Sequence, residues 1–209
     1  MALAVNSSIL QFTGKLGNIV GYIRNGKQFY RALPRKSTKE PTPLQIAQKT
    51  RFRMTHDVLR PINPLVSTTF KHRKNRAGHN LAFAYTIGNV ITGPYPDYAI
   101  NWSKLLISNG TLFPAAQPEA MVDSGRIIYQ WKFQPFNNYH QMDQVILAVY
   151  CPELKQCIYT IGSAERKCAG AGIDVQSFSG YTVHTYIGFI SPNKKLASRS
   201  QYTGSFTII

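Results

Sequence analysis

Cations and aromatic side chains alternate around one Asn-Gly pair near the start of the chain. Asn25-Gly26 separates two runs, 18–24 and 27–33, in which apolar and polar residues alternate. A two-residue type I′ turn needs positive φ at both positions, so Asn-Gly between such runs predicts a β-hairpin. One face of this hairpin mixes aromatic, cationic and aliphatic residues: Val20, Tyr22, Arg24, Lys27, Phe29, Arg31 and Leu33. The other face carries Ile19, Ile23, Tyr30 and Ala32.

The cations and aromatic rings of this hairpin are suited to binding a partner rather than to catalysis. Cations contact phosphates, and aromatic rings stack on bases or pack in interfaces. The candidate polyanion-binding cations are Arg24, Lys27 and Arg31, and the candidate stacking or interface rings are Tyr22, Phe29 and Tyr30. An isolated hairpin is marginally stable in water, so we expect it to pack against another sheet, a helix or another subunit.

Further cations lie on a predicted helix and in a run after it. Thr42 as N-cap, Pro43 at the first helical position and Gln45 in a capping box predict a helix that ends near residue 59, before Pro61. At 100° per residue its apolar stripe, expected to pack in the core, is Leu44, Ala47, Met54 and Val58. The opposite face carries Lys49, Arg53, His56 and Arg60. The later run adds four more polyanion-binding candidates: Lys71, Arg73, Lys74 and Arg76.

Positive charge is concentrated in the first third of the chain. The 209 residues hold 24 Lys and Arg against 9 Asp and Glu, a net charge of +15. Residues 1–76 hold 15 of these cations and two carboxylates (15 − 2 = +13), whereas residues 77–209 hold 9 and 7 (9 − 7 = +2). Such asymmetry favours contact with nucleic acid, an anionic surface or an acidic subunit over a merely solubilising surface.

Residue patterns typical of catalysis are missing. Nine carboxylates offer little material for acid–base chemistry or metal binding, and the five histidines form no His-x-x-x-His pair. Neither a P-loop nor a Gly-x-Ser-x-Gly motif occurs. We therefore expect no enzyme activity, no cofactor and no metal site. The three cysteines have no metal-ligand spacing and are expected to be reduced, although Cys151 and Cys157 flank a predicted hairpin loop that could bring them together.

The pattern becomes strand-like after Gly93-Pro94-Tyr95-Pro96, which follows a second predicted helix from about Asn80 to Ile91. The predicted strands are 98–108, 126–134, 143–151, 156–161, 172–178, 182–191 and 201–209. Trp131 is a candidate core residue. We predict an α+β fold, with a basic hairpin, linker and helical region over residues 1–96 and an immunoglobulin-like or fibronectin-like β-sandwich over residues 97–209. Since no signal peptide or membrane span is recognisable, a cytoplasmic location is the default, with a particle or filament as the alternative.

Several segments resemble a Bacteroidota-associated family of uncharacterised proteins. They include Phe12-Thr-Gly-Lys-Leu-Gly-Asn-Ile-Val-Gly-Tyr22, Arg24-Asn-Gly-Lys27, Arg31-Ala-Leu-Pro34 and Pro41-Thr-Pro-Leu-Gln-Ile-Ala-Gln48. The resemblance covers nearly the whole chain. It implies the same chain layout and a bacterial or phage source, and it implies no activity.

Three functions fit these observations. The first is a structural or assembly subunit that forms a homo-oligomer through its N-terminal arm, on or around a polyanion. The second is a nucleic-acid-binding protein that uses the basic N-terminal region. The third is a β-sandwich that binds a small molecule or carbohydrate. The first is favoured because the hairpin needs a packing partner, whereas no recognised nucleic-acid-binding motif is present.

Overall fold

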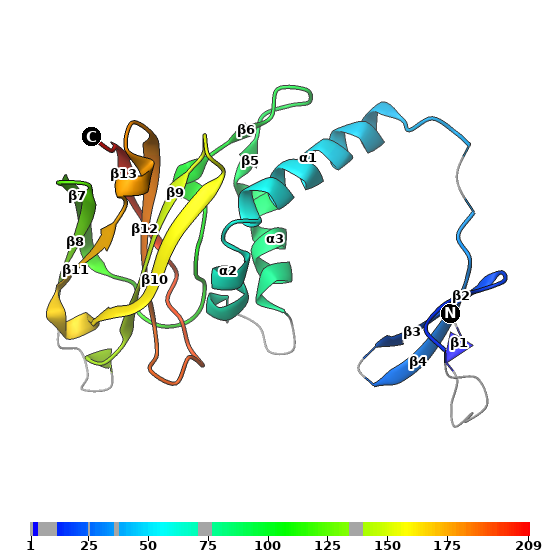
Figure 1. Cartoon of the computed structure of the whole chain (residues 1–209), viewed down its shortest axis with the longest axis horizontal. Helices are drawn as coiled ribbons and strands as arrows, with labels where there is room; N and C mark the ends of the chain where they lie inside the picture. The colour runs from blue at the N-terminus through cyan, green and yellow to red at the C-terminus, as the bar shows by residue number, and fades with distance from the viewer. Residues whose placement is uncertain (1, 4–11, 25, 36–37, 71–76, 134–139) are drawn as a thin grey trace. The chain divides into compact units, whose positions relative to one another are not determined.

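The chain forms a mixed α+β fold made of two compact units, residues 1–42 and residues 43–209 (Figure 1). The computed structural model describes residues 2–3, 12–24, 26–35, 38–70, 77–133 and 140–209. An N-terminal antiparallel sheet is followed by three helices and then by several antiparallel sheets. The predicted α+β class is confirmed.

The N-terminal unit is a four-stranded antiparallel sheet in the order β1-β4-β3-β2. Its strands are β1 (Ala2–Leu3), β2 (Gly14–Leu16), β3 (Ile19–Arg24) and β4 (Lys27–Ala32). The predicted hairpin is confirmed, because Arg24 pairs with Lys27, Tyr22 with Phe29 and Val20 with Arg31. Gly26 has a φ of 73°, as the turn requires. Strands β1 and β2, which the sequence did not predict, extend the hairpin on both sides.

Three helices begin the second unit. They are α1 (Pro43–Leu59), α2 (Asn63–Thr69) and α3 (Gly78–Asn89). The predicted start and end of the first helix are confirmed, and α3 lies two residues earlier than expected. Helix α2 was not predicted; Pro64 stands in its first turn, where a missing N–H costs nothing. No helix among the described residues is both long and apolar enough to cross a membrane.

The apolar stripe of α1 is used only in part. Leu44 was expected in the core but is 83% exposed, whereas Val58 and Leu59 near the other end of the helix are buried. Arg51 helps to fix α1, because its Nη2 donates a hydrogen bond to the carbonyl oxygen of Ile87 at 2.7 Å, in the last turn of α3. A cation is favourable at that helix end. Helix α1 therefore packs through its C-terminal half, and the periodicity alone overestimated its buried face.

The strands of the second unit form two larger sheets, ordered β10-β9-β12-β13 and β11-β8-β7. They are β7 (Ala116–Asp123), β8 (Arg126–Lys132), β9 (Gln144–Cys151), β10 (Gln156–Glu165), β11 (Gly170–Asp174), β12 (Thr182–Ile190) and β13 (Gln201–Thr207). A small pair, β5 (Ile91–Thr92) and β6 (Ala99–Ile100), follows α3.

Two of the predicted strands were wrong, and one strand was not predicted. The predicted strand 172–178 ends at Asp174 in β11, and Gln176–Phe178 forms a 3₁₀ turn. The expected strand 98–108 is instead the two-residue β6 and a 3₁₀ turn, η1 (Trp102–Lys104), followed by buried non-strand residues. Strand β7 was missed because Pro118 and Glu119 disfavour a strand. It lies at a sheet edge with a register shift between Ala116 and Glu119, which is where proline is tolerated.

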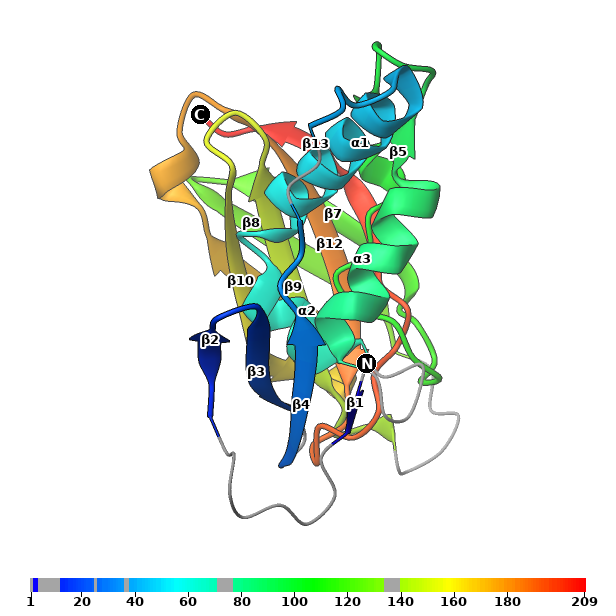
Figure 2. The ribbon, with the colours of Figure 1, turned by 90° about the vertical axis from the view of Figure 1, so that its right-hand side faces the viewer.

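The sheet β10-β9-β12-β13 is the middle layer of the second unit. The sheet β11-β8-β7 covers one of its faces and the helices cover the other, as Figures 1 and 2 show. Alternate residues of β9 serve the two cores: Leu147 and Val149 face the other sheet, and Ile146 and Ala148 face the helices. Trp131 lies in the core between the sheets and is 4% exposed. The domain boundary expected at residue 96 stays a prediction, and elements from before and after it share one hydrophobic core.

The core between the two sheets should dominate the stability of the second unit. Replacing Leu147, which is fully buried in β9, with alanine should lower the free energy of unfolding by about 2–5 kcal/mol, because it removes apolar contacts and leaves a cavity. Ile209→Ala is the control, since that side chain is almost fully exposed and its loss should change little. Urea denaturation measures both, and equal effects would contradict the assigned core.

Candidate functional site

The N-terminal sheet carries its cationic side chains on one face and most of its aliphatic side chains on the other. Strands pair with Lys15 opposite Val20 and Val20 opposite Arg31, so these side chains share a face with the rows Tyr22–Phe29 and Arg24–Lys27. We call it the cationic face: Lys15, Val20, Tyr22, Arg24, Lys27, Phe29 and Arg31. All four of its cations are exposed. Strands β2, β3 and β4 contain no other cation, so the opposite face carries none from these strands.

The two aromatic rings of the cationic face lie against each other. The centroids of Tyr22 and Phe29 are 5.6 Å apart and their planes differ by 17°. The guanidinium carbon of Arg31 lies 6.0 Å from the centroid of the Tyr22 ring, at the limit of a cation–π contact. Tyr22 and Phe29 are therefore brought together with Arg31, as the hairpin register predicts.

The other side of the sheet is apolar. We call it the apolar face: Leu16, Ile19, Gly21, Ile23, Gln28, Tyr30 and Ala32. The backbone at Phe12 crosses this face, where its carbonyl oxygen accepts a hydrogen bond from Gln28 Nε2 at 2.7 Å. A Cβ atom at Gly21 would collide with that same oxygen, which explains the glycine. Tyr30 packs on the Phe12 ring with centroids 5.4 Å apart, so it is separated from Tyr22 and Phe29.

The cations predicted on the first helix are all exposed. Lys49, Arg53 and His56 are exposed on α1, and Arg60 is exposed in the turn directly after it. The further candidates Lys71, Arg73, Lys74 and Arg76 fall outside the described residues. Arg60 also lines a groove. The sequence did not predict this groove.

That groove runs between α1 and the turn joining β9 to β10. It consists of two pockets of about 260 and 480 Å³ that share Asp57 and Lys155. Most of the residues that line the smaller pocket are apolar or aromatic: Met54, Val58, Ile100, Trp102, Tyr150 and Pro152. Burial raises the pKa of Tyr150 above its ordinary value, so its phenol stays protonated at neutral pH. The groove has the chemistry to hold a small molecule with an apolar part and a charged group.

An aromatic stack supports the floor of the groove. The Trp102 ring lies on the His184 imidazole with centroids 5.1 Å apart, and His184 Nδ1 is 2.9 Å from Tyr202 Oη. Burial lowers the pKa of His184, which favours the neutral ring. Tyr186 Oη donates a hydrogen bond to the carbonyl oxygen of Trp102 at 2.9 Å. The polar atoms of His184, Tyr202 and Tyr186 are therefore engaged in hydrogen bonds within the protein.

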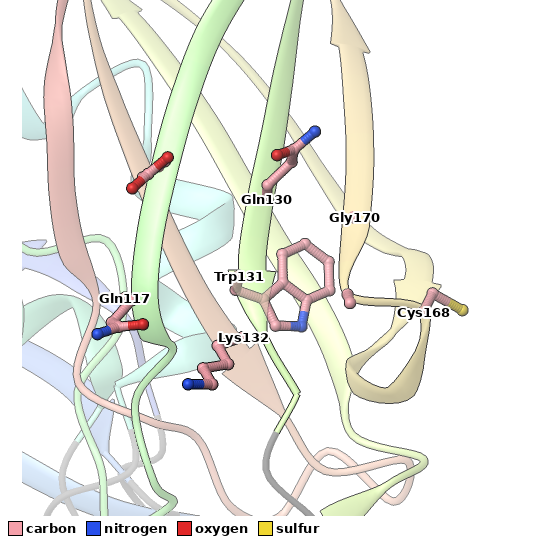
Figure 3. Close-up of a pocket in the computed structure, with 8 residues that line it drawn as sticks. Gln117, Gln130, Trp131, Lys132, Cys168 and Gly170 are labelled. Carbon is pink, nitrogen blue, oxygen red and sulfur yellow. The ribbon is translucent and has the colours of Figure 1, made fainter.

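A further pocket, outside the groove, is polar and open. It has a volume of about 440 Å³ and is lined by Gln117, Glu119, Gln130, Trp131, Lys132, Cys168, Ala169 and Gly170. Figure 3 shows the Cys168 sulfur directed away from the Trp131 ring and from Lys132. Because Trp131 is buried, it presents little ring surface on which a sugar could stack. This pocket offers hydrogen bonds without a nucleophile–base pair among its described residues.

The cysteines and carboxylates of the described residues form no metal site. Cys157 pairs with Tyr150 and Gln156 pairs with Cys151, which places Cys151 and Cys157 on opposite faces of the sheet. The expectation that their side chains could lie together is therefore wrong, and all three thiols are free. Burial raises the pKa of the Cys157 thiol to about 12, so it is protonated at neutral pH.

A buried ion pair connects three segments at one end of the two sheets. Arg166, 8% exposed, and Asp143, 1% exposed, place Nη2 and Oδ2 3.3 Å apart. The same guanidinium donates hydrogen bonds to the carbonyl oxygens of Phe113 at 2.7 Å and Pro114 at 3.2 Å. Its carbon lies 3.8 Å from the centroid of the Phe189 ring. Sequence reasoning missed this group because its members are far apart in the chain.

Removing the Asp143 charge should destabilise the second unit. Asp143→Asn leaves Arg166 buried without its carboxylate, and we expect a loss of about 3–5 kcal/mol in the free energy of unfolding. The neighbouring exposed pair, Lys167 Nζ and Glu165 Oε2 at 2.7 Å, provides the control, because water screens it. Thermal and urea unfolding should show little change for Glu165→Gln. A similar loss in both variants would contradict the special role of the buried pair.

Comparison with known proteins places the chain without assigning an activity. No curated protein matches it. A family model described as a family of unknown function, DUF6266, matches residues 11–204, which include most of the N-terminal sheet and nearly all of the second unit. The chain therefore belongs to the DUF6266 family.

Proposed function

We propose that the protein is a non-enzymatic assembly subunit that self-associates through the apolar face of its N-terminal sheet. The observation that carries this proposal is the exposure of Leu16, Ile19 and Ile23, which are 59%, 48% and 59% exposed on that face. Exposed apolar side chains gathered on one face are typical of an interaction surface. A second copy of the chain is the proposed occupant.

Charge favours association through this face over the other. Two cationic faces would bring Lys15, Arg24, Lys27 and Arg31 of each copy against like charges. Two apolar faces can meet without that repulsion, because no cation of strands β2, β3 and β4 lies on them. The cationic faces then stay available on the outside of the pair.

The small size of the N-terminal sheet also supports the proposal that a partner covers its apolar face. Neither hydrophobic core of the protein includes a described residue from 1–42. Strands β1 and β2 are two and three residues long, so β3 and β4 supply most of the sheet. A small sheet of this kind has little apolar burial of its own, and covering one face would add stability.

The second unit is proposed to be the body of the subunit, with a fibronectin-like or immunoglobulin-like sandwich as its framework. Of its seven main strands in chain order, the first, second and fifth (β7, β8, β11) form one sheet and the other four form the second. Constant-type immunoglobulin domains divide their strands in the same way, apart from the fourth strand. Here the fourth strand, β10, pairs with the third.

Self-association is tested by removing apolar surface without altering the strands. Threonine is β-branched like isoleucine, so Ile19→Thr combined with Ile23→Thr should keep the sheet while weakening the interface. We expect the concentration of half-dissociation to rise about tenfold or more, measured by size-exclusion chromatography with light scattering.

The matched control for that variant is Met121→Thr, which changes an exposed apolar residue of β7 in the second unit. It should leave the oligomer intact. A chain lacking residues 1–33 should stay folded, because the described residues in that range contribute to neither core, and should be monomeric. A parent chain that is monomeric at all concentrations, or a truncated chain that still assembles, would contradict the proposal.

A further inference from the structure

We propose that the cationic face of the N-terminal sheet binds single-stranded nucleic acid, with Tyr22 and Phe29 as the base-stacking platform. This inference goes beyond the proposed self-association and does not depend on it, because it uses the opposite face of the sheet. It rests on three features of that face: the segregation of the cations, the aromatic pair between them and the charge of the unit.

The cations stand at both ends of the face with the rings between them. Arg24 and Lys27 form the row next to the hairpin turn, and Lys15 and Arg31 flank Val20 in the row at the other end. Val20 and Arg24 are four residues apart on β3, which corresponds to about 13 Å along the strand. The Tyr22–Phe29 row lies midway. A strand crossing this face would meet positive charge before and after the aromatic platform.

The aromatic pair decides between kinds of polyanion. Tyr22 and Phe29 lie nearly parallel, with planes 17° apart, and both keep part of their surface exposed. Bases in a duplex are stacked on one another, whereas single-stranded bases are free to stack on protein rings. An acidic protein would pair with the cations but would gain less from the rings.

The charge of the unit supports the same partner. Residues 1–42 hold seven Lys and Arg and one carboxylate, Glu40 (7 − 1 = +6). The four cations on the cationic face have no carboxylate on their own strands β2, β3 and β4 to neutralise them. Lysine and arginine in such an array bind phosphates through release of counterions, so affinity should fall steeply with salt.

The first test compares two tyrosines on opposite faces of one sheet. Binding of a labelled oligothymidine of about 15 nucleotides to the full-length protein is measured by fluorescence anisotropy. Tyr22→Val should weaken binding about fivefold or more, because a stacking ring is lost while strand propensity is kept. Tyr30→Val, on the apolar face, should bind like the parent. Equal losses in the two variants, or no binding by the parent, would overturn the proposal.

The second test counts phosphate contacts and does not require the rings. Replacing Arg24 and Lys27 with Gln should reduce the slope of log affinity against log salt by about 1.4, or about 0.7 for each lost contact with a single strand. Both residues are exposed beside the hairpin turn, so the sheet should survive even if Tyr22→Val disturbs it. The matched control replaces Lys49 and Arg53 with Gln on α1. If the slope is unchanged without Arg24 and Lys27 but reduced without Lys49 and Arg53, the phosphate contacts lie on the helix and the proposal is overturned.

Two further measurements, binding to heparin and the oligomeric state, distinguish base stacking from a purely structural role of the rings and from self-association. Heparin has the charge without the bases, so Tyr22→Val should bind it as the parent does. An equal loss for heparin and oligothymidine would show that the rings only support the sheet, which contradicts the stacking platform. Light scattering should show Tyr22→Val with the parent's oligomeric state. Nucleic-acid binding by a monomeric parent would support this inference while contradicting the proposed self-association.

Discussion

The second unit depends on a sheet that must be covered on both faces. Strand β9 is buried along almost its whole length, and its alternate side chains enter two different cores. Strand β12 does the same, with Ile187 facing the other sheet and Tyr186 facing the helices. A strand of this kind cannot expose either face to water without a large loss of apolar burial. The helices and the second sheet are therefore both structural requirements of the middle layer.

The buried ion pair follows from the same close packing. Arg166 and Asp143 lie where burial of a charge is costly, and the pair is tolerated because the guanidinium also finds two carbonyl oxygens and an aromatic ring. Burial lowers the pKa of Arg166 and the nearby Asp143 carboxylate opposes that shift. The group connects residues 113–114, 143 and 166 and leaves little freedom for the chain there. The two Nη atoms of Arg166 are engaged in these contacts, whereas its buried Nε has no hydrogen-bond partner.

The N-terminal unit follows the opposite principle. The backbone at Phe12 crosses part of its apolar face, yet Leu16, Ile19 and Ile23 stay exposed there, and the four cations stay exposed on the other face. Period-two alternation along β3 and β4 sorts them, cations with two rings on one side and aliphatic residues on the other.

Local physics determined part of this protein from the sequence. The Asn25-Gly26 pair predicted the register of β3 and β4 that the structure shows, and with it the faces of Tyr22, Phe29 and Tyr30. Pro43 and the break at Pro61 bounded α1. These features depend on neighbouring residues, so they can be recognised without knowing what packs where.

Only tertiary structure decided which surfaces are covered. Leu44 and Val58 share the helix stripe, yet one is exposed and the other buried, because only the C-terminal half of α1 packs into the core. Strand β7 forms despite Pro118 and Glu119 because its edge position needs fewer ladder hydrogen bonds. The groove beside Asp57 and the Arg166–Asp143 pair join segments far apart in the chain. Such contacts depend on the packing of whole elements, which no local pattern of residues records.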